Sequence, residues 1–334
     1  MSIRPSVLAL SALLLAAPPA LAQSKAPVEP LGTALEGLPS AFPVQYLSTK
    51  VEGQDVRLAY LDVKPTARAN GRTVVLLHGK NFFGAYWEPT IRALTAAGFR
   101  VVAPDQLGFG RSSKPDVHYS FHTLASLTKQ VLDSLGIKQA VILGHSMGGM
   151  LATRFALMYP QATERLILEN PIGLEDYREK APWQPTEAYY KEQLAVTEES
   201  TRKYHHTYYV KWKPEYDVWV QVLYRQTLGG DYPRLAQVAA RTSQMIYEQP
   251  VVHEFPWVKP RALVVIGQED RTFIGRGKVP ADVAATMGQY PQLGKKTAQA
   301  IPQATLVELP GVGHIPHLEA PEKFHAAVLD FLAK

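Results

Sequence analysis

The stretch VILGHSMGGM, residues 141–150, ends an apolar run in one serine and places glycines on both sides of it. The apolar run predicts a buried strand, and the residues after it predict a helix that Pro160 ends. A direct turn from strand to helix holds its central residue, Ser146, in a strained conformation. Gly144 and Gly148 keep side chains from colliding across such a turn. We therefore predict that Ser146 is a nucleophile with an exposed hydroxyl at a helix N-terminus, where backbone N–H groups favour developing negative charge.

A glycine-rich turn between a strand and a helix can instead serve packing, as it does in nucleotide-binding sheets. The chain contains neither G-x-G-x-x-G nor a G-K-[ST] loop, the patterns that such sheets require. The nucleophile interpretation is therefore favoured over the packing interpretation.

A serine hydroxyl needs a base to take its proton, and the base needs an orienting group. Among ten histidines, His314 is favoured as the base because it follows a predicted strand and two glycines, in a loop that can project over the sheet edge. His317 precedes the terminal helix and is interpreted as a packing or capping residue.

The orienting acid is expected where a strand ends. VVIGQEDRT supplies Asp270, which residues 267–269 can present on a turn. Its neighbour Glu269 is interpreted as solvated, and Glu169, at the end of LILE, is the more distant candidate. We predict Asp270 as the orienting acid.

Apolar runs alternate with amphipathic segments over most of the chain, which favours βαβ units and one largely parallel sheet. The expected strands are 44–51, 56–63, 72–79, 100–106, 140–146, 165–170, 261–270 and 304–311, and the expected helices are 87–99, 119–136, 148–160 and 321–334.

The alternation breaks at residues 172–256, which hold ten of the sixteen tyrosines and three of the five tryptophans. We interpret this block as a helical insertion, a cap or lid, between the two parts of a core at 44–171 and 257–334. Its rings can form a small core of their own, line an apolar substrate channel, or do both.

The first 22 residues carry one cation, a short apolar run and a small-x-small site, as a secretory signal peptide does. The run is too short to span a membrane, which needs about 20 apolar residues. Export to the periplasm or the medium is therefore expected, with no stable membrane anchor after cleavage. Residues 23–43 are rich in Pro, Ala and Gly and predict an irregular arm.

The composition excludes several kinds of site. No cysteine is present, so disulfides and thiolate metal sites are impossible. The net charge of +5 is mild, and no basic run predicts nucleic-acid binding. His118 and His122 have metal-ligand spacing but no acidic residue nearby, so neither a metal nor another cofactor is expected.

Four patterns together resemble the α/β-hydrolase fold family: LLHG at 76–79, PDQLGFGRSSKP at 104–115, GHSMGG at 144–149 and GHIPHLEAPEKF at 313–324. The chain order Ser146, Asp270, His314 is also that of the family triad.

The resemblance implies a mostly parallel sheet flanked by helices and an oxyanion hole made of two backbone N–H groups. One belongs to Met147, and the other to Lys80 or, as the alternative, Asn81. It also implies structural roles for three residues near these loops: His78, Asp105 and Arg111.

Asn81, Phe82, Phe83 and His145 are expected to line the substrate pocket. The predicted function is cofactor-free hydrolysis of a small carboxylic ester with an apolar or aromatic group. The alternatives are a C–C bond hydrolase or peptidase with the same triad, or a binding protein that retains the fold. The oligomeric state is left open.

Overall fold

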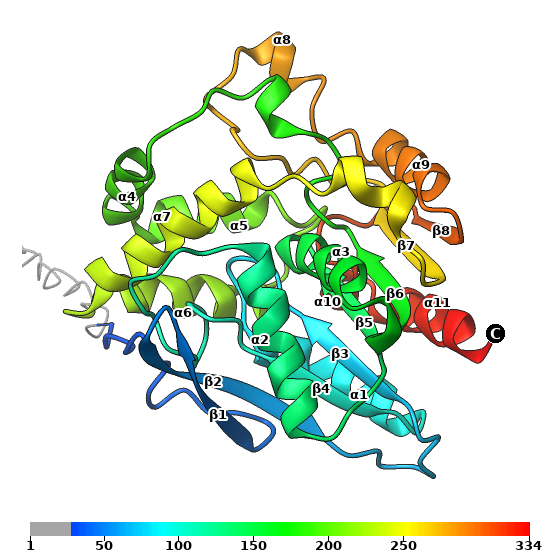
Figure 1. The fold of residues 1–334 in the computed structure, drawn as a ribbon. Coiled ribbons are helices and arrows are strands. Elements are labelled where there is room, and N and C mark those ends of the chain that lie inside the picture. Colours follow the sequence, from blue (N-terminus) through cyan, green and yellow to red (C-terminus); the bar gives the residue numbers. More distant parts are fainter. Residues whose placement is uncertain (1–27) are drawn as a thin grey trace, which may run out of the picture.

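A computed structural model describes residues 28–334, so the predicted signal peptide, residues 1–22, lies outside the described residues. An eight-stranded sheet forms the centre, in the order β1-β2-β4-β3-β5-β6-β7-β8 (Figure 1). The pairs β1–β2 and β2–β4 are antiparallel, and all the other neighbouring strands are parallel. The strands are β1 Val44–Val51, β2 Gln54–Val63, β3 Thr73–Leu77, β4 Arg100–Pro104, β5 Ala140–His145, β6 Thr163–Glu169, β7 Ala262–Gly267 and β8 Ala304–Leu309.

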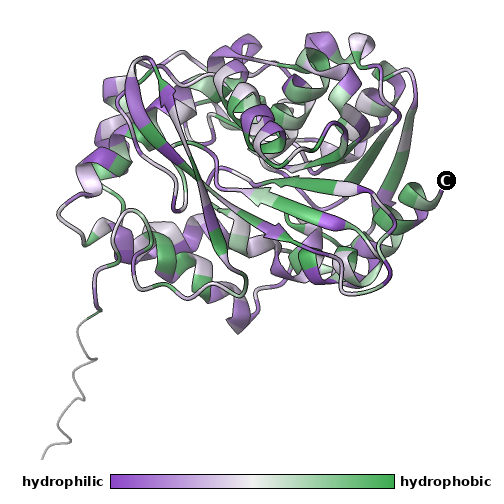
Figure 2. Cartoon of the chain, turned by 60° about the horizontal axis from the view of Figure 1, so that its bottom comes forward, coloured by the Kyte–Doolittle hydropathy of each residue, from purple (hydrophilic) through white to green (hydrophobic). Residues whose placement is uncertain are grey.

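The central strands are apolar on both faces. Every residue of β3, β5 and β7 is buried, and Figure 2 shows hydrophobic residues along the central strands. Successive side chains point to opposite faces of a strand. Val74 and Leu76 therefore join the hydrophobic cluster that includes α1 (Glu88–Ala96) and α11 (Pro321–Ala333). Val75 and Leu77 join the cluster that includes α2 (Phe121–Ser134) and α3 (Met147–Met158). This is the doubly covered, mostly parallel sheet that the sequence predicts.

Helices cover both faces of the sheet, with α1 against α11 and α2 against α3. The helix α2 begins where the Ser120 hydroxyl accepts a hydrogen bond from the Thr123 N–H at 3.0 Å. Outside the cap, the helices are α1 Glu88–Ala96, α2 Phe121–Ser134, α3 Met147–Met158, α8 Ala281–Ala284, α9 Tyr290–Ala300, α10 Pro316–Glu319 and α11 Pro321–Ala333. No helix within 28–334 combines the length and the apolar character needed to cross a bilayer.

Four helices lie between β6 and β7, in the segment that the sequence suggests as a cap. Figure 1 shows them gathered on one side of the sheet. α4 packs on α7 and α5 packs on α6. The cap helices are α4 Thr186–Leu194, α5 Glu198–His206, α6 Asp217–Thr227 and α7 Tyr232–Glu248.

Residues 28–43 contain neither helix nor strand, yet they pack tightly on the cap. Leu31 and Leu35 are each 2% exposed and contact Phe83 and Val222. The Leu31 N–H donates to the Arg225 carbonyl at 2.9 Å. The arm therefore connects α6 of the cap to the loop that follows β3.

The sequence patterns predict no element for residues 271–303, where the structure has α8 and α9. The reason is that α9 has few apolar residues and packs through small ones. A Cβ on Gly294 would lie 2.6 Å from Cγ1 of Ile266 in β7, and Thr297 is 2% exposed. The fully buried face of α9 thus offers only one large apolar residue, Tyr290, to a sequence pattern.

Candidate active site

Ser146 forms the turn between β5 and α3. Its backbone has φ 56° and ψ −122°, a conformation whose cost for a non-glycine residue is about 1–3 kcal/mol. The neighbouring glycines make the turn possible, because a Cβ on Gly144 would lie 2.0 Å from the Gly148 carbonyl oxygen. A Cβ on Gly148 would lie 2.1 Å from the Leu77 oxygen. The GHSMG pattern therefore has the steric basis that the sequence predicts.

Ser146, His314 and Asp270 form one hydrogen-bonded chain. The Ser146 Oγ lies 3.0 Å from Nε2 of His314, and Nδ1 of His314 lies 2.6 Å from Oδ2 of Asp270. The three residues follow β5, β8 and β7, whose carboxyl ends meet because the strands are parallel. The arrangement can activate a serine hydroxyl, with the imidazole as base and the carboxylate as orienting group.

Asp270 is 1% exposed and receives hydrogen bonds on both oxygens. Burial alone would raise its pKa, but the facing His314 ring and hydrogen bonds from Asn170 and Thr272 bring the pKa below the ordinary value of a carboxyl. The carboxylate therefore stays ionised opposite the imidazole. Its neighbour Glu269 is exposed, as predicted.

Asn170 is a supporting residue that the sequence reasoning missed. Its Nδ2 donates to Oδ2 of Asp270 at 2.8 Å, and its Oδ1 accepts from the Gly267 N–H at 2.8 Å. The side chain thus ties the end of β6 to the turn that carries Asp270. The one available signal was its position directly after the LILE run, at the edge where the strands end.

Replacing Asn170 by alanine should lower the free energy of unfolding by about 1–3 kcal/mol, because it leaves the buried Gly267 N–H unpaired and removes one donor to Asp270. It should also lower kcat about tenfold, since Asp270 loses a donor that holds its orientation. Denaturant unfolding and ester hydrolysis measure the two effects. Glu269→Ala, on the exposed neighbour, is the matched control and should change neither. An unchanged kcat in Asn170→Ala would remove Asn170 from the site.

A second carboxylate–histidine pair lies in the interior. Nδ1 of His317 is 2.9 Å from Oε1 of Glu169, and both side chains are fully buried. The His317 ring stacks on Trp87 at 4.1 Å. Glu169 therefore pairs with His317 and not with His314. Each of the two candidate bases thus has a different carboxyl group as its partner.

The loop after β3 runs beside the serine, since a Cβ on Gly79 would lie 3.2 Å from the Ser146 Cβ. His78 holds this loop: its Nδ1 bonds the Gly79 oxygen and its Nε2 accepts from the Gln106 N–H, both at 2.9 Å. His78 thus has the structural role that the resemblance implies. Burial also lowers the pKa of the neighbouring Lys80 ammonium to about 8.

The backbone N–H groups of Lys80 and Met147 find no hydrogen-bond acceptor in residues 28–334. Met147 is the first residue of α3, where helix N–H groups have no partner within the helix. Both N–H groups can therefore bind an anionic oxygen, and their assignment as oxyanion donors stays a prediction.

Residues 81–83 of this loop contact different neighbours. Asn81 donates to the Tyr208 hydroxyl at 3.2 Å, and Phe82 stacks on Tyr86 at 4.7 Å. Phe82 also contacts the Tyr208 ring of the cap, 6.2 Å away between centroids. Phe83, by contrast, packs with the N-terminal arm and α6. Asn81 and Phe82 therefore face the cap, whereas Phe83 belongs to the contact with the arm.

The prediction that His145 lines the substrate pocket is wrong. Its ring is fully buried, with Nε2 2.8 Å from the His314 carbonyl oxygen and Nδ1 3.1 Å from the Tyr86 hydroxyl. Burial, followed by the nearby His314 and His317, holds the pKa of His145 well below its ordinary value. The neutral ring supports the loop that carries the base, because both of its nitrogens are used within the protein.

The cap covers the candidate triad. The Tyr208 ring stacks on the His314 ring at 4.8 Å, and the backbone carbonyl of Tyr208 accepts from the backbone N–H of His314 at 2.7 Å. Ser146 is 6% exposed, so the expectation of an exposed hydroxyl is wrong. The turn itself presents the hydroxyl, but the cap then closes over it.

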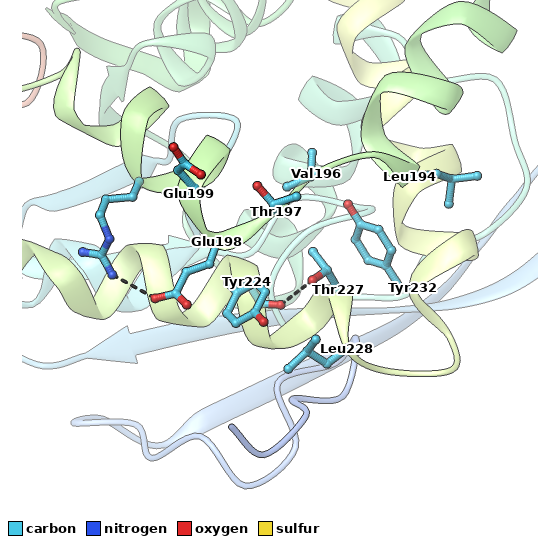
Figure 3. Close-up of a pocket in the computed structure, with 10 residues that line it drawn as sticks. Leu194, Val196, Thr197, Glu198, Glu199, Tyr224, Thr227, Leu228 and Tyr232 are labelled. Carbon is cyan, nitrogen blue, oxygen red and sulfur yellow. Dashed lines mark hydrogen bonds and ion pairs between the residues drawn. The ribbon is translucent and has the colours of Figure 1, made fainter. Parts of the chain in front are cut away.

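Two cavities lie outside the triad. One, of about 740 Å³, opens within the cap, where Thr197 lies near Tyr224 of α6 and Tyr232 of α7 (Figure 3). The other, of about 590 Å³, lies between cap and core and is lined by residues that include Tyr86 and Trp219. Neither cavity is lined by a member of the candidate triad.

Potential metal ligands do not gather elsewhere. In the described part of the chain, no group of three or more His, Asp or Glu side chains could hold a metal ion. His118 precedes α2 and His122 lies in its first turn, so the pair is not on one helical face.

Two comparisons with known proteins cover most of the chain. A model of the alpha/beta hydrolase fold matches residues 72–321. The crystal structure of a probable hydrolytic enzyme from Pseudomonas aeruginosa PAO1 is 47% identical and has a TM-score of 0.89. The match covers 91% of this chain and 98% of that one.

Curated relatives match more distantly. An uncharacterized protein from Mycobacterium tuberculosis is 38% identical over 105 residues, which are 31% of this chain and 30% of that protein. The chain thus spans less than a third of that relative's length. A 2-hydroxy-6-oxo-6-phenylhexa-2,4-dienoate hydrolase from Burkholderia cepacia is 26% identical, and the match covers 79% of this chain and 88% of that protein.

Proposed function

Because the chain belongs to the α/β-hydrolase fold family, we propose that it is a serine hydrolase that cleaves a carboxylic ester through an acyl-enzyme. The proposal is carried by the hydrogen-bonded chain from Ser146 through His314 to Asp270, with distances of 3.0 and 2.6 Å. The 47% identical probable hydrolytic enzyme supports the reaction class.

The residues divide the reaction between them. The Ser146 Oγ attacks the ester carbonyl carbon while Nε2 of His314 takes its proton, and Asp270 stabilises the imidazolium that forms. The carbonyl oxygen becomes an anion held by the N–H groups of Lys80 and Met147. His314 then gives the proton to the leaving alkoxide, which departs as the alcohol. Water, deprotonated by His314, attacks the acyl-enzyme and releases the acid and Ser146.

A C–C bond hydrolase is the second candidate. The relative from Burkholderia cepacia, whose name gives a dienoate as substrate, favours it over a peptidase. The same triad serves ester and C–C cleavage, so the site geometry does not distinguish them. Family members with a carboxylate nucleophile are disfavoured, because a serine stands at position 146.

The cap supports an apolar or aromatic substrate group. Tyr208 and Phe82 cover the site with rings, and each buried CH₂ of a substrate contributes about 0.8 kcal/mol. We propose that the enzyme acts without a cofactor and, from its N-terminal sequence, after export. A binding protein that retains the fold is disfavoured because the three residues are aligned for proton transfer.

A fluorophosphonate probe and a series of p-nitrophenyl esters test the proposal on the mature protein. We expect the probe to label Ser146 and kcat/KM to increase from acetate to longer acyl chains. Labelling without ester turnover, but with cleavage of a 2-hydroxy-6-oxo-dienoate, would replace the first candidate by the second. The absence of labelling would refute a serine hydrolase.

A further inference from the structure

One buried histidine of the cap has no partner. His205 lies in the last turn of α5 and is 0% exposed. Within residues 28–334, neither its Nδ1 nor its Nε2 has a hydrogen-bond partner. Native proteins pair the great majority of their buried polar groups, so an imidazole with both nitrogens unpaired requires an explanation.

The surroundings of this ring are aromatic. His205 meets Phe82 at 5.8 Å and Tyr208 at 5.5 Å between ring centroids, both nearly edge to face. The carboxylate whose charge acts on it, Asp217, is ion-paired with Arg202. Burial lowers the pKa of His205 to about 4. The ring is therefore neutral at pH 7 and offers one N–H donor and one nitrogen acceptor.

The ring also borders the proposed reaction centre on two sides. Phe82 lies two residues after Lys80, the predicted oxyanion donor. Tyr208 stacks on His314 at 4.8 Å. His205 is thus one ring away from the oxyanion loop and one ring away from the base. A substrate chain that extended from the scissile carbonyl toward α5 would pass close to it.

We propose that His205 determines substrate specificity by hydrogen bonding to a keto or hydroxyl oxygen carried on the acyl chain. The proposal rests on the function proposed above and narrows its substrate class from plain alkyl esters to oxygen-substituted ones. A plain chain would leave both nitrogens of His205 unpaired in the complex, which favours the substituted chain. Phe82 and Tyr208 contact each other at 6.2 Å, so the oxygen reaches His205 when one of these rings turns aside.

Matched p-nitrophenyl esters test this proposal. The series compares pentanoate and hexanoate esters with the same esters bearing a keto group at the 3-, 4- or 5-position. At one position of the keto group, the wild-type kcat/KM should exceed that of the plain ester by about tenfold, as expected for one hydrogen bond. His205→Phe should bring the two values within about twofold of each other, through a loss on the keto ester alone.

Two further variants and one stability measurement distinguish a role of His205 in substrate recognition from a structural role. His205→Asn keeps a donor and an acceptor and should retain part of the preference. His206→Phe, on the exposed neighbour in α5, is the matched control and should retain all of it. The thermal midpoint of His205→Phe should be unchanged or higher, because the variant removes unpaired polar atoms. A large fall in that midpoint would show that His205 is bonded within the protein and would overturn the proposal.

Calorimetric binding of the same esters to Ser146→Ala provides a comparison that does not depend on turnover. If wild type hydrolyses no ester but Ser146→Ala binds a keto ester about tenfold more tightly than its plain partner, the reaction class is wrong and the role of His205 stands. If plain and keto esters are equivalent at every position in turnover and in binding, the role of His205 is refuted. A preference that persists in His205→Phe refutes it as well.

Discussion

Ser146→Ala should lower kcat on every ester that the protein hydrolyses by about 10⁴- to 10⁶-fold, the range seen when a triad nucleophile is removed. Within residues 28–334 the Ser146 Oγ is hydrogen-bonded to His314 alone, so its removal deletes the attacking atom and one hydrogen bond. Alanine has a Cβ like serine and meets the same strain at φ 56°. The thermal midpoint should therefore change by only a few degrees. Steady-state kinetics and thermal unfolding measure the two quantities.

Ser134→Ala is the matched control for this variant. Ser134 lies in α2 and its hydroxyl bonds a carbonyl of its own helix, three residues earlier. Both the turnover and the thermal midpoint of this control should stay close to wild type. Turnover of Ser146→Ala within tenfold of wild type would place the nucleophile elsewhere.

His314→Ala and His317→Ala should fail in different ways. His314→Ala removes the base and should lower kcat by about 10⁴-fold or more. His317→Ala should instead lower the free energy of unfolding by about 1–3 kcal/mol, the range for leaving a buried polar group without its partner. The reason is that Glu169 is fully buried and has no side-chain partner in the described residues except His317.

His314→Ala should lower the free energy of unfolding less than His317→Ala does. Asn170 and Thr272 still donate hydrogen bonds to the buried Asp270 when the His314 side chain is removed. The folded fraction of His317→Ala should retain kcat within about tenfold of wild type, measured per active site titrated with a phosphonate. His317→Gln keeps a donor and should recover part of the lost stability. If His317→Ala were inactive while folded, the assignment of the base would be reversed.

The nucleophile turn was predictable because its cause is local. The clash that a Cβ on Gly144 would make with the Gly148 oxygen acts within five residues, and GHSMG contains both glycines. Gly148 also leaves room for Leu77 of β3, a contact that the pattern does not show. The strands were predictable for the same reason, since a strand buried on both faces must be apolar throughout. The interval around α9 was not predictable, because this helix packs through Gly294 and Thr297 against neighbours distant in sequence.

The supporting residues could not be predicted from local patterns, because each of them contacts a residue that is distant in the sequence. Asn170 meets Asp270 across 100 residues, and His145 meets the His314 carbonyl across 169. His145 looks like a pocket residue in sequence because it adjoins Ser146. In the structure its side chain points into the interior, because successive residues at the end of a strand face opposite sides.

The sequence by itself determined the fold class, the strained serine and the histidine expected to serve it, because each follows from spacing and sterics within short segments. Only the tertiary structure decided which carboxylate faces which histidine: Asp270 meets His314, and Glu169 meets His317. It also placed Tyr208 over the base and left His205 unpaired among rings. The physical reason is that a hydrogen bond requires two groups in contact and burial requires neighbouring elements that cover the residue. Both exist only after parallel strands bring their carboxyl ends together and the cap closes over them.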